Sequence, residues 1–525
     1  MPKRCAARPA APVAAVLTAL VVVLSACGDG SASPAPPGST TSTTARATPP
    51  PTTASTTTPS SITTAAAPPV TPVQWAPCGD LQCGSVTVPL DDADPAGPTL
   101  QIAVARHPAE EPSARIGSLV INPGGPGGSG IDDLPEELSV LTPALLDRFD
   151  IVSFDPRGVD RSSPVTCPAS GTPTPASESA PAPAPDPVPT TATARLALLR
   201  NDEAFAAQCE HASGEILPTV GTVDTARDLD RIRQALGDAR LTFIGNSYGT
   251  LLGATYAELF PTHVRAMVLD SAIDPALTTL QYAGEQADSL ESELSAFATW
   301  CTDTGCPWHP GADPTAALLG LIQSSRGRPL PVAGGGSVGP AVLYRDLLTG
   351  LDSTSSWPSL AAALAGAAAG RGSLAAALAG SGSTGASSNQ ADAEQAIDCL
   401  DHPVDRTPAS YPGLAARLAR TAPVFGPLLA WSLMACAVWP ALPTRTPAPA
   451  RDPGAPPILV VGTTGDPVTP YLWSVDLARE LTGGVLLTWE GRSHVAYFYS
   501  PCVRDAVQAY LVEGALPAPG TTCTD

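Results

Sequence analysis

The chain has 525 residues, of which 43% are hydrophobic, and its formal net charge is −21 at pH 7. This length favours more than one domain or large insertions, and the apolar content excludes a wholly disordered chain. A strongly acidic chain repels phosphate backbones, so we expect no nucleic-acid partner.

The first 26 residues predict a signal peptide. A basic start precedes the apolar stretch 11–24, which is too short to span a bilayer comfortably. The following run 24–27, Leu-Ser-Ala-Cys, resembles a bacterial lipobox, in which the cysteine is lipidated and becomes the mature N-terminus. Ordinary cleavage near Ala26, with Cys27 incidental, is the alternative. We therefore expect an exported protein that is lipid-anchored to the outer face of the cell membrane through Cys27 alone, or else secreted.

Residues 27–74 are predicted to form the lipidated cysteine and a disordered tether. They are almost entirely Ser, Thr, Pro, Ala and Gly, which bury too little apolar surface to offset the entropy of ordering. The remaining chain is predicted to form one α/β core in two parts, residues 75–274 and 456–525. A helical cap or lid, residues 275–455, is predicted to separate them.

Short apolar runs that alternate with helical patterns predict the core. Continuous apolar runs are typical of strands buried on both faces of a parallel sheet. These runs are 118–122, 150–154, 241–245, 266–270, 458–462 and 485–489. Residues 224–236 have apolar positions at helical spacing and end before Gly237. Strands separated by helices predict a doubly wound, mostly parallel α/β sheet.

The run Gly245-Asn-Ser-Tyr-Gly249 fits the G-x-S-x-G nucleophile elbow. The run 335–339 fits the same pattern, but no strand precedes it. Ser247 instead follows a predicted strand and opens a helical stretch, so that the turn would project its hydroxyl above the sheet. Ser247 is therefore the predicted nucleophile.

A nucleophilic serine needs a base, and the base needs an orienting carboxylate. In this fold the chain order is Ser, then Asp or Glu, then His. His494 follows the last predicted strand in the run 491–494, and Asp466 follows the strand before it. We predict Ser247, Asp466 and His494 to be the catalytic triad.

The oxyanion hole is predicted to combine the Tyr248 N–H with one from the glycine-rich loop 122–130. Gly125 is the chosen second donor and Gly124 the alternative. A glycine-rich loop of this kind could also bind phosphate. This segment lacks the Gly-Lys-Ser/Thr ending of a phosphate-binding loop, so we reject that interpretation.

Ten cysteines beyond Cys5 and Cys27 predict disulfides, because an exported chain folds under oxidising conditions. A metal site at Cys301, Cys306 and His309 is disfavoured, since no second ligand pair has zinc-site spacing. We expect neither a metal nor a cofactor. Connectivity does not follow from sequence, and pairing of sequential neighbours is the working hypothesis: Cys78–Cys83, Cys167–Cys209, Cys301–Cys306, Cys399–Cys436 and Cys502–Cys523.

Several motifs together resemble a known family. Pro123-Gly-Gly-Pro-Gly127 looks like the His-Gly-Gly-Pro-Gly of proline iminopeptidases, with Pro123 in place of the histidine. From about Trp75 onward, further motifs resemble, in order, the secreted tripeptidyl aminopeptidases of high-GC bacteria and their TAP-like C-terminal region. They are Phe154-Asp-Pro-Arg-Gly158, Gly245-Asn-Ser-Tyr-Gly249, Cys436-Ala-Val-Trp-Pro440, Asp466-Pro-Val-Thr-Pro470, Gly491-Arg-Ser-His494 and the closing Cys502 and Cys523.

The resemblance implies an α/β-hydrolase fold with an inserted helical cap. It also implies a serine exopeptidase that removes short peptides, typically tripeptides, from a substrate with a free N-terminus. The same triad would serve a carboxylesterase or lipase acting on envelope lipids or small esters, because the triad does not distinguish amides from esters. A free N-terminus calls for carboxylates that hold its ammonium group. Glu285, Glu291 and Glu293 on the first cap helix are candidates, but a solvated helix face is the favoured interpretation for each.

Overall fold

The computed structural model describes residues 70–168, 186–331, 337–371 and 389–525. The predicted signal peptide, the predicted lipidation site Cys27 and the predicted tether as far as residue 69 lie outside these residues.

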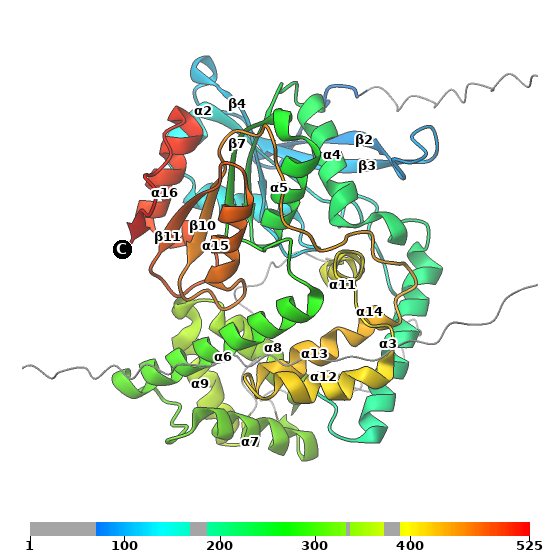
Figure 1. Cartoon of the computed structure of the whole chain (residues 1–525), viewed down its shortest axis with the longest axis vertical. Helices are drawn as coiled ribbons and strands as arrows, with labels where there is room; N and C mark the ends of the chain where they lie inside the picture. Colours follow the sequence, from blue (N-terminus) through cyan, green and yellow to red (C-terminus); the bar gives the residue numbers. More distant parts are fainter. Residues whose placement is uncertain (1–69, 169–185, 332–336, 372–388) are drawn as a thin grey trace, which may run out of the picture. The chain divides into compact units, whose positions relative to one another are not determined.

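A ten-stranded sheet organises the described chain, in the order β1-β2-β3-β5-β4-β6-β7-β10-β11-β12 (Figure 1). The pairs β1–β2, β2–β3 and β3–β5 are antiparallel, and every pair from β5 to β12 is parallel. The strands are β1 Ala76–Cys78, β2 Leu81–Pro89, β3 Thr99–His107, β4 Gly117–Asn122, β5 Phe149–Phe154, β6 Leu241–Asn246, β7 Val264–Asp270, β10 Leu459–Thr463, β11 Val485–Trp489 and β12 Thr522–Cys523.

The central strands explain the apolar runs of the sequence. Every residue of β4, β5 and β6 is buried, as expected for parallel strands with both faces covered. All six predicted strands are present, each with bounds within two residues of those expected. The prediction of a mostly parallel α/β sheet is confirmed.

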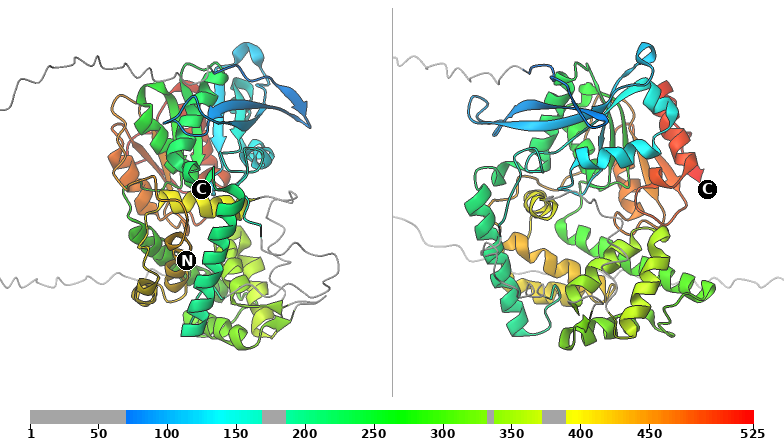
Figure 2. Two further views of the ribbon diagram at one scale, coloured as in Figure 1. Left: turned by 90° about the vertical axis from the view of Figure 1, so that its right-hand side faces the viewer. Right: turned by 180° about the vertical axis from the view of Figure 1, so that it is seen from behind.

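Helices cover both faces of the sheet (Figures 1 and 2). The residues that pack against one face, among them Leu229, Leu252 and Leu477, come from α4, α5 and α15. On the other face, residues such as Leu134, Leu145 and Val503 come from α1, α2 and α16. The bounds are α1 Gly130–Val140, α2 Pro143–Arg148, α4 Thr222–Ala235, α5 Tyr248–Leu259, α15 Tyr471–Glu480 and α16 Pro501–Gln508.

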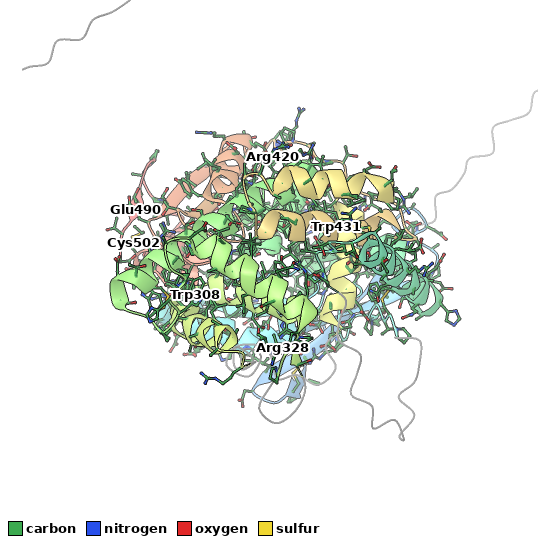
Figure 3. The ribbon with its side chains drawn as sticks, turned by 90° about the horizontal axis from the view of Figure 1, so that it is seen from below. Trp308, Arg328, Arg420, Trp431, Glu490 and Cys502 are labelled. Atoms are coloured by element: carbon green, nitrogen blue, oxygen red, sulfur yellow. A yellow bond between two sulfur atoms is a disulfide. The ribbon has the colours of Figure 1, made fainter. Side chains whose placement is uncertain are left out.

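The segment between β7 and β10 is mainly helical and has its own core. Phe297 stacks on Trp308 at 5.5 Å between ring centroids and meets the edge of Trp357 at 5.7 Å. Trp308 and Trp431, both labelled in Figure 3, belong to this core. The elements are α6 Thr279–Thr304, α7 Pro314–Gly327, β8 Leu330–Pro331, β9 Ser337–Val338, α8 Pro340–Leu351, α9 Trp357–Ala368, α11 Gln390–Asp401, α12 Tyr411–Leu418, α13 Phe425–Ser432 and α14 Met434–Ala437.

One helix outside this segment also packs against it. The helix α3, Ala192–Ser213, precedes the nucleophile in the chain, and its Phe205 contacts Trp439 at 6.1 Å between ring centroids. Helices from two parts of the chain, α3 and the segment between β7 and β10, therefore pack together. The predicted cap boundaries, 275 and 455, stay a prediction.

The structure contains five disulfides among the described residues, and they join the expected pairs. Cys301 and Cys306 are bonded to each other, so neither thiol is free to bind a metal. Cys399–Cys436 ties α11 to α14, and Cys502–Cys523 ties α16 to β12.

The Phe154-Asp-Pro-Arg-Gly158 motif contributes Arg157 to a buried ion pair. Arg157 is fully buried, and its Nε and Nη2 donate to the two carboxylate oxygens of Asp228, each at 2.7 Å. Three backbone carbonyl oxygens, those of Pro89, Leu90 and Thr219, accept its remaining hydrogen bonds. Burial would lower the pKa of Arg157, but the Asp228 carboxylate raises it above its ordinary value.

Candidate active site

Ser247 occupies the turn between β6 and α5. Its backbone has φ 55° and ψ −122°, a positive φ that residues other than glycine rarely adopt. A Cβ at position 245 would lie 2.2 Å from the Gly249 carbonyl oxygen, and one at position 249 would lie 2.6 Å from the Asn122 carbonyl oxygen. The turn therefore requires both glycines, and it places the serine at the N-terminus of α5.

The second G-x-S-x-G match has a different setting. Ser337 lies in β9, which pairs only with β8 in a separate two-stranded sheet of the described residues. Ser337 is exposed, and the first two glycines of this match lie outside the described residues. The surroundings of Ser337 do not form a strand-to-helix elbow.

Asp466 and His494 are in direct contact. The His494 Nδ1 lies 3.0 Å from both carboxylate oxygens of Asp466. Asp466 is 1% exposed and also accepts hydrogen bonds from the backbone N–H groups of Val468 and Thr469, each at 2.9 Å. Because Asp466 engages Nδ1, the His494 Nε2 is the nitrogen available for proton transfer.

The surroundings shift the pKa values of Asp466 and His494 in opposite directions. Burial alone would raise the pKa of Asp466, but the charge and hydrogen bond of His494 hold it below its ordinary value. Burial alone would lower the pKa of His494, but the carboxylates of Asp466, then Asp352 and Asp270, raise it to about 9. The carboxylate therefore stays ionised and favours a positive charge on the imidazole.

Asp270, at the end of β7, links the elbow to the histidine loop. Its carbonyl oxygen accepts the Ser247 N–H at 2.9 Å. Its carboxylate accepts the N–H groups of Ala496 at 3.2 Å and Tyr497 at 2.8 Å, and burial raises its pKa to about 7. The next residue, Ser271, accepts the Val495 N–H on its hydroxyl at 2.8 Å. Sequence reasoning missed Asp270 and Ser271, although an acid directly after a buried strand was a visible signal.

The glycine-rich loop after β4 lies against the elbow. A Cβ at position 124 would lie 3.0 Å from the Ser247 Cβ and 3.3 Å from the Tyr248 nitrogen. The Gly124 N–H already donates to the Asn122 side chain at 3.2 Å, whereas no acceptor in the described chain takes the N–H of Gly125 or Tyr248. This geometry agrees with Gly125 rather than Gly124 as the second oxyanion donor, and the role stays a prediction.

Two carboxylates on α11 stand beside the same loop. Gly127 packs so closely against the first turn of α11 that a Cβ there would lie 2.6 Å from the Glu394 nitrogen. Asp398 follows one turn later, on the same face of the helix. Neither carboxylate has a hydrogen-bond partner or a cation among the described residues. The Glu394 side chain is partly open to solvent, and Asp398 is half-buried. Burial, and for Asp398 also the charge of Glu394, raises the pKa of both groups.

An aromatic wall adjoins this acidic pair. Tyr282 contacts His402 at 4.8 Å and Trp473 at 4.9 Å between ring centroids. Burial, followed by the charges of Asp398 and Glu394, raises the pKa of Tyr282. The two carboxylates therefore lie near both the predicted oxyanion loop and an aromatic surface, and no cation of the described residues neutralises them.

The three glutamates considered from the sequence serve as hydrogen-bond acceptors within the protein. Glu285 accepts from the Trp473 indole at 2.6 Å, and Glu291 accepts from the Val424 N–H at 3.1 Å. Glu293 is 1% exposed and accepts from Arg492 at 2.8 Å. A solvated helix face is therefore wrong for Glu293, because a long-range contact that the sequence pattern does not reveal buries it.

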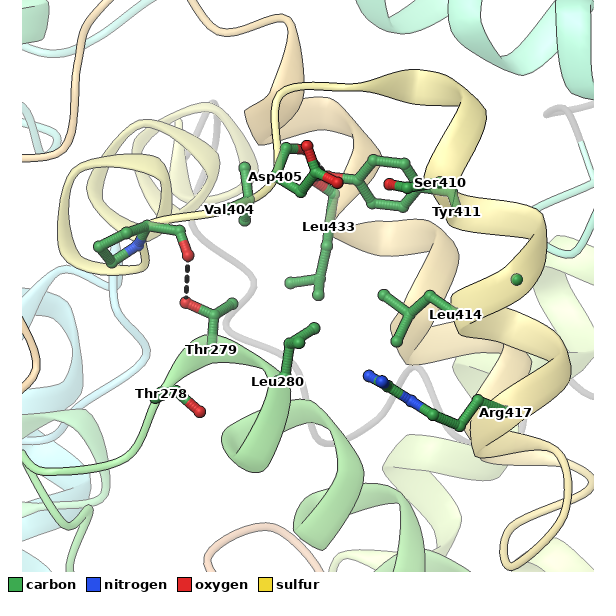
Figure 4. Close-up of a pocket in the computed structure, with 12 residues that line it drawn as sticks. Thr278, Thr279, Leu280, Val404, Asp405, Ser410, Tyr411, Leu414, Arg417 and Leu433 are labelled. Carbon is green, nitrogen blue, oxygen red and sulfur yellow. Dashed lines mark hydrogen bonds between the residues drawn. The ribbon is translucent and has the colours of Figure 1, made fainter. Parts of the chain in front are cut away.

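A cavity of about 430 Å³ lies within the helical segment, at the start of α6 and beside α12 (Figure 4). Leu280, Leu414 and Leu433 line it, and the Arg417 side chain points toward it. None of its lining residues belongs to the predicted triad or oxyanion hole. The cavity therefore does not mark the proposed reaction centre.

Two searches of the described residues bear on other kinds of site. No group of three or more His, Cys, Asp or Glu side chains there is arranged to hold a metal ion. None of the helices in the described ranges has both the length and the apolar character that crossing a membrane requires.

Comparison with known proteins places this geometry in a class. Residues 117–310 match the family model described as alpha/beta hydrolase fold, and residues 422–523 match the model described as TAP-like protein. The described sheet and helices are those of an α/β hydrolase. A proline iminopeptidase structure from Mycobacterium smegmatis aligns with 82% of this chain and 98% of its own, with 16% identity and a TM-score of 0.36.

Curated relatives define the family more closely. The chain is 36% identical over 486 residues to the serine protease Hip1 of Mycobacterium tuberculosis, covering 86% of this chain and 91% of that protein. It is 33% identical over 476 residues to the tripeptidyl aminopeptidase of Streptomyces coelicolor, covering 86% of each. It is 34% identical over 473 residues to carboxylesterase B of Mycobacterium tuberculosis, covering 84% of this chain and 86% of that protein. The chain belongs to the α/β-hydrolase-fold tripeptidyl aminopeptidase family, with its TAP-like C-terminal region.

Proposed function

We propose that the protein is an exported serine exopeptidase that releases tripeptides or other short peptides from free N-termini. The observation that carries the proposal is the contact between the His494 Nδ1 and the buried Asp466 carboxylate. It lies beside a strained serine turn, since Asp270 bonds to both the elbow and the histidine loop. Relatives named serine protease and tripeptidyl aminopeptidase support the same reaction.

In the proposed mechanism, the Ser247 hydroxyl attacks the scissile carbonyl carbon while the His494 Nε2 accepts its proton. Asp466 keeps Nδ1 protonated and stabilises the imidazolium. The N–H groups of Gly125 and Tyr248 donate to the tetrahedral oxyanion. His494 then protonates the leaving amine, and a water molecule activated by the same imidazole releases the peptide from the acyl-enzyme.

The carboxylates of Glu394 and Asp398 support the preference for a free N-terminus. A substrate ammonium group would supply the cation that these two groups lack among the described residues. An ester without a positive charge would gain nothing from them. The acidic pair therefore favours an aminopeptidase over a general esterase.

The test compares a tripeptide amide with a free N-terminus, its N-acetylated form and a short acyl ester. We expect the purified protein to cleave the first far faster than the second. Ser247→Ala should abolish cleavage, and the matched Ser337→Ala variant should cleave like the wild type. Cleavage of the ester alone would instead favour the carboxylesterase function that the relative named carboxylesterase B suggests.

We also propose that the protein is a lipoprotein on the outer face of the cell membrane. The proposal rests on the lipobox-like run 24–27 and the Ser/Thr/Pro-rich residues that follow it. Mass spectrometry of the mature N-terminal peptide should show a diacylglycerol modification on Cys27. Cys27→Ala should move the protein from the membrane fraction to the medium, and an unmodified wild-type peptide would contradict the proposal.

A further inference from the structure

The first helix of the segment between β7 and β10 contacts both loops that carry the predicted acid and base. Three polar residues of α6, Gln286, Ser289 and Glu293, are separated by three and four positions, which places them on one face of the helix. Each of them bonds to a residue of the Asp466 loop or the His494 loop. We call these three residues the polar stripe of α6.

Two members of the polar stripe hold the aspartate loop. The Ser289 hydroxyl donates to the carbonyl oxygen of Asp466 itself at 2.6 Å. The Gln286 side-chain amide donates to the carbonyl oxygen of Val468 at 2.9 Å. The Val468 N–H in turn donates to the Asp466 carboxylate at 2.9 Å. The helix thus bonds to the backbone at Asp466 itself and two residues after it.

The third member holds the histidine loop. The Glu293 carboxylate accepts a charged hydrogen bond of 2.8 Å from Arg492, two residues before His494. Glu293 is 1% exposed, and its second carboxylate oxygen is buried without a partner in the described chain. A buried carboxylate of this kind is costly unless it is paired, so the contact fixes where Arg492 can lie.

The two loops are also joined to each other. The N–H groups of Thr464 and Gly465 donate to the carbonyl oxygens of Trp489 and Gly491, each at 2.9 Å. A Cβ at position 465 would lie 2.7 Å from the Arg492 side chain, so the loops pack without a gap there. A shift of α6 would therefore act on the loops of the acid and the base together, whereas Ser247 has no contact with the polar stripe among the described residues.

We propose that the polar stripe of α6 positions Asp466 and His494, so that docking of the helical segment sets the geometry of the triad. Ser289 and Glu293 are positioning residues and do not touch the substrate. The inference rests on the proposed serine-hydrolase mechanism, but it does not depend on whether the substrate is a peptide or an ester. Small displacements of catalytic groups cost large factors in rate, so each contact should be measurable in activity.

The experiment measures Ser247 reactivity directly. A small fluorophosphonate labels an activated serine irrespective of substrate class, and its labelling rate is compared with kcat and KM on the tripeptide amide. We expect Ser289→Ala and Glu293→Gln to lower the labelling rate and kcat by about tenfold or more, with KM nearly unchanged. Ser295→Ala is the matched control, because this serine is exposed on the same helix. Among the described residues, its hydroxyl donates only to the Glu291 carbonyl oxygen.

A purely structural role would give a different result. In that case the variants would lower the melting temperature while folded protein kept the wild-type labelling rate and the wild-type pH dependence of labelling. Ser289→Thr keeps the hydroxyl and should label at nearly the wild-type rate if the bond to the Asp466 carbonyl oxygen positions the triad. This variant also tests the proposal if Ser289→Ala folds poorly. Wild-type labelling in all folded variants overturns the proposal. Labelling without peptide cleavage in the wild type would overturn the proposed peptidase function alone.

Discussion

The backbone N–H of Ser247 donates a 2.9 Å hydrogen bond to the carbonyl oxygen of Asp270. The carboxylate of the same aspartate accepts two N–H groups from the loop that follows His494. The buried Asp270 therefore bonds both to the nucleophile Ser247 and to the loop after the base His494, although these lie in distant parts of the chain.

Asp270→Ala should impair activity and stability together. The substitution leaves the Ala496 and Tyr497 N–H groups buried without an acceptor, which costs about 1–3 kcal/mol for each unsatisfied group. We expect kcat/KM to fall by at least about tenfold, because the histidine loop loses its anchor. Chemical denaturation and tripeptide hydrolysis measure the two effects. Asp303→Ala, an exposed aspartate near the end of α6, is the control, and equal behaviour of the two variants would refute this role.

The activity should rise with pH. Because its carboxylate neighbours raise the pKa of His494 to about 9, the imidazole is mostly protonated at neutral pH and gains its base form as pH increases. Asp352→Asn removes one of these charges while keeping the backbone carbonyl that accepts the His494 N–H at 3.0 Å. The midpoint of the kcat/KM profile should therefore move to lower pH in this variant. A midpoint near 6.5 in the wild type, or an unchanged midpoint in Asp352→Asn, would contradict the assignment.

Glu394 and Asp398 should matter only for substrates with a free amine. In Glu394→Gln and Asp398→Asn we expect KM for the tripeptide amide to rise by about tenfold or more, because a charge-assisted hydrogen bond to the ammonium group is lost. Hydrolysis of a neutral ester should stay at the wild-type rate. Glu210→Gln, on the exposed side of α3, controls for the change in net charge. A parallel loss with both substrates would show that the pair shapes the site rather than binding the amine.

Breaking the Arg157–Asp228 pair should be strongly destabilising. Arg157→Met leaves the fully buried Asp228 carboxylate without its partner, and such a loss costs about 3–5 kcal/mol. Arg479→Met removes an exposed pair with Asp476 and should cost less than about 1 kcal/mol. Urea unfolding measures both variants. The double variant Arg157→Met/Asp228→Leu should recover part of the loss, and equal effects of Arg157→Met and Arg479→Met would rule out the argument.

The sequence was sufficient where the signal is local. Ser247 stands out because a buried strand, two glycines and a helix surround it within a dozen residues. Asp466 and His494 follow from chain order and from their places after two strands, and the structure brings them into contact. Their catalytic roles, like those of Gly125 and Tyr248, stay predictions.

The remaining features depend on contacts between distant segments. The polar residues of α6 look like an ordinary solvated helix face until the fold brings them to the aspartate and histidine loops. The contact of Phe205 on α3 with Trp439 is likewise not visible in the sequence pattern. Side-chain periodicity reports which face of an element is buried, but not which partner covers it.

The position of the helical segment between β7 and β10 has a consequence for biogenesis. The elbow serine is synthesised well before β10 and β11, which must add to the sheet beside β7 before the acid and the base reach it. An incomplete chain emerging from the ribosome would thus carry the nucleophile without the predicted acid and base. We therefore expect the chain to gain hydrolase activity only after translation has passed His494.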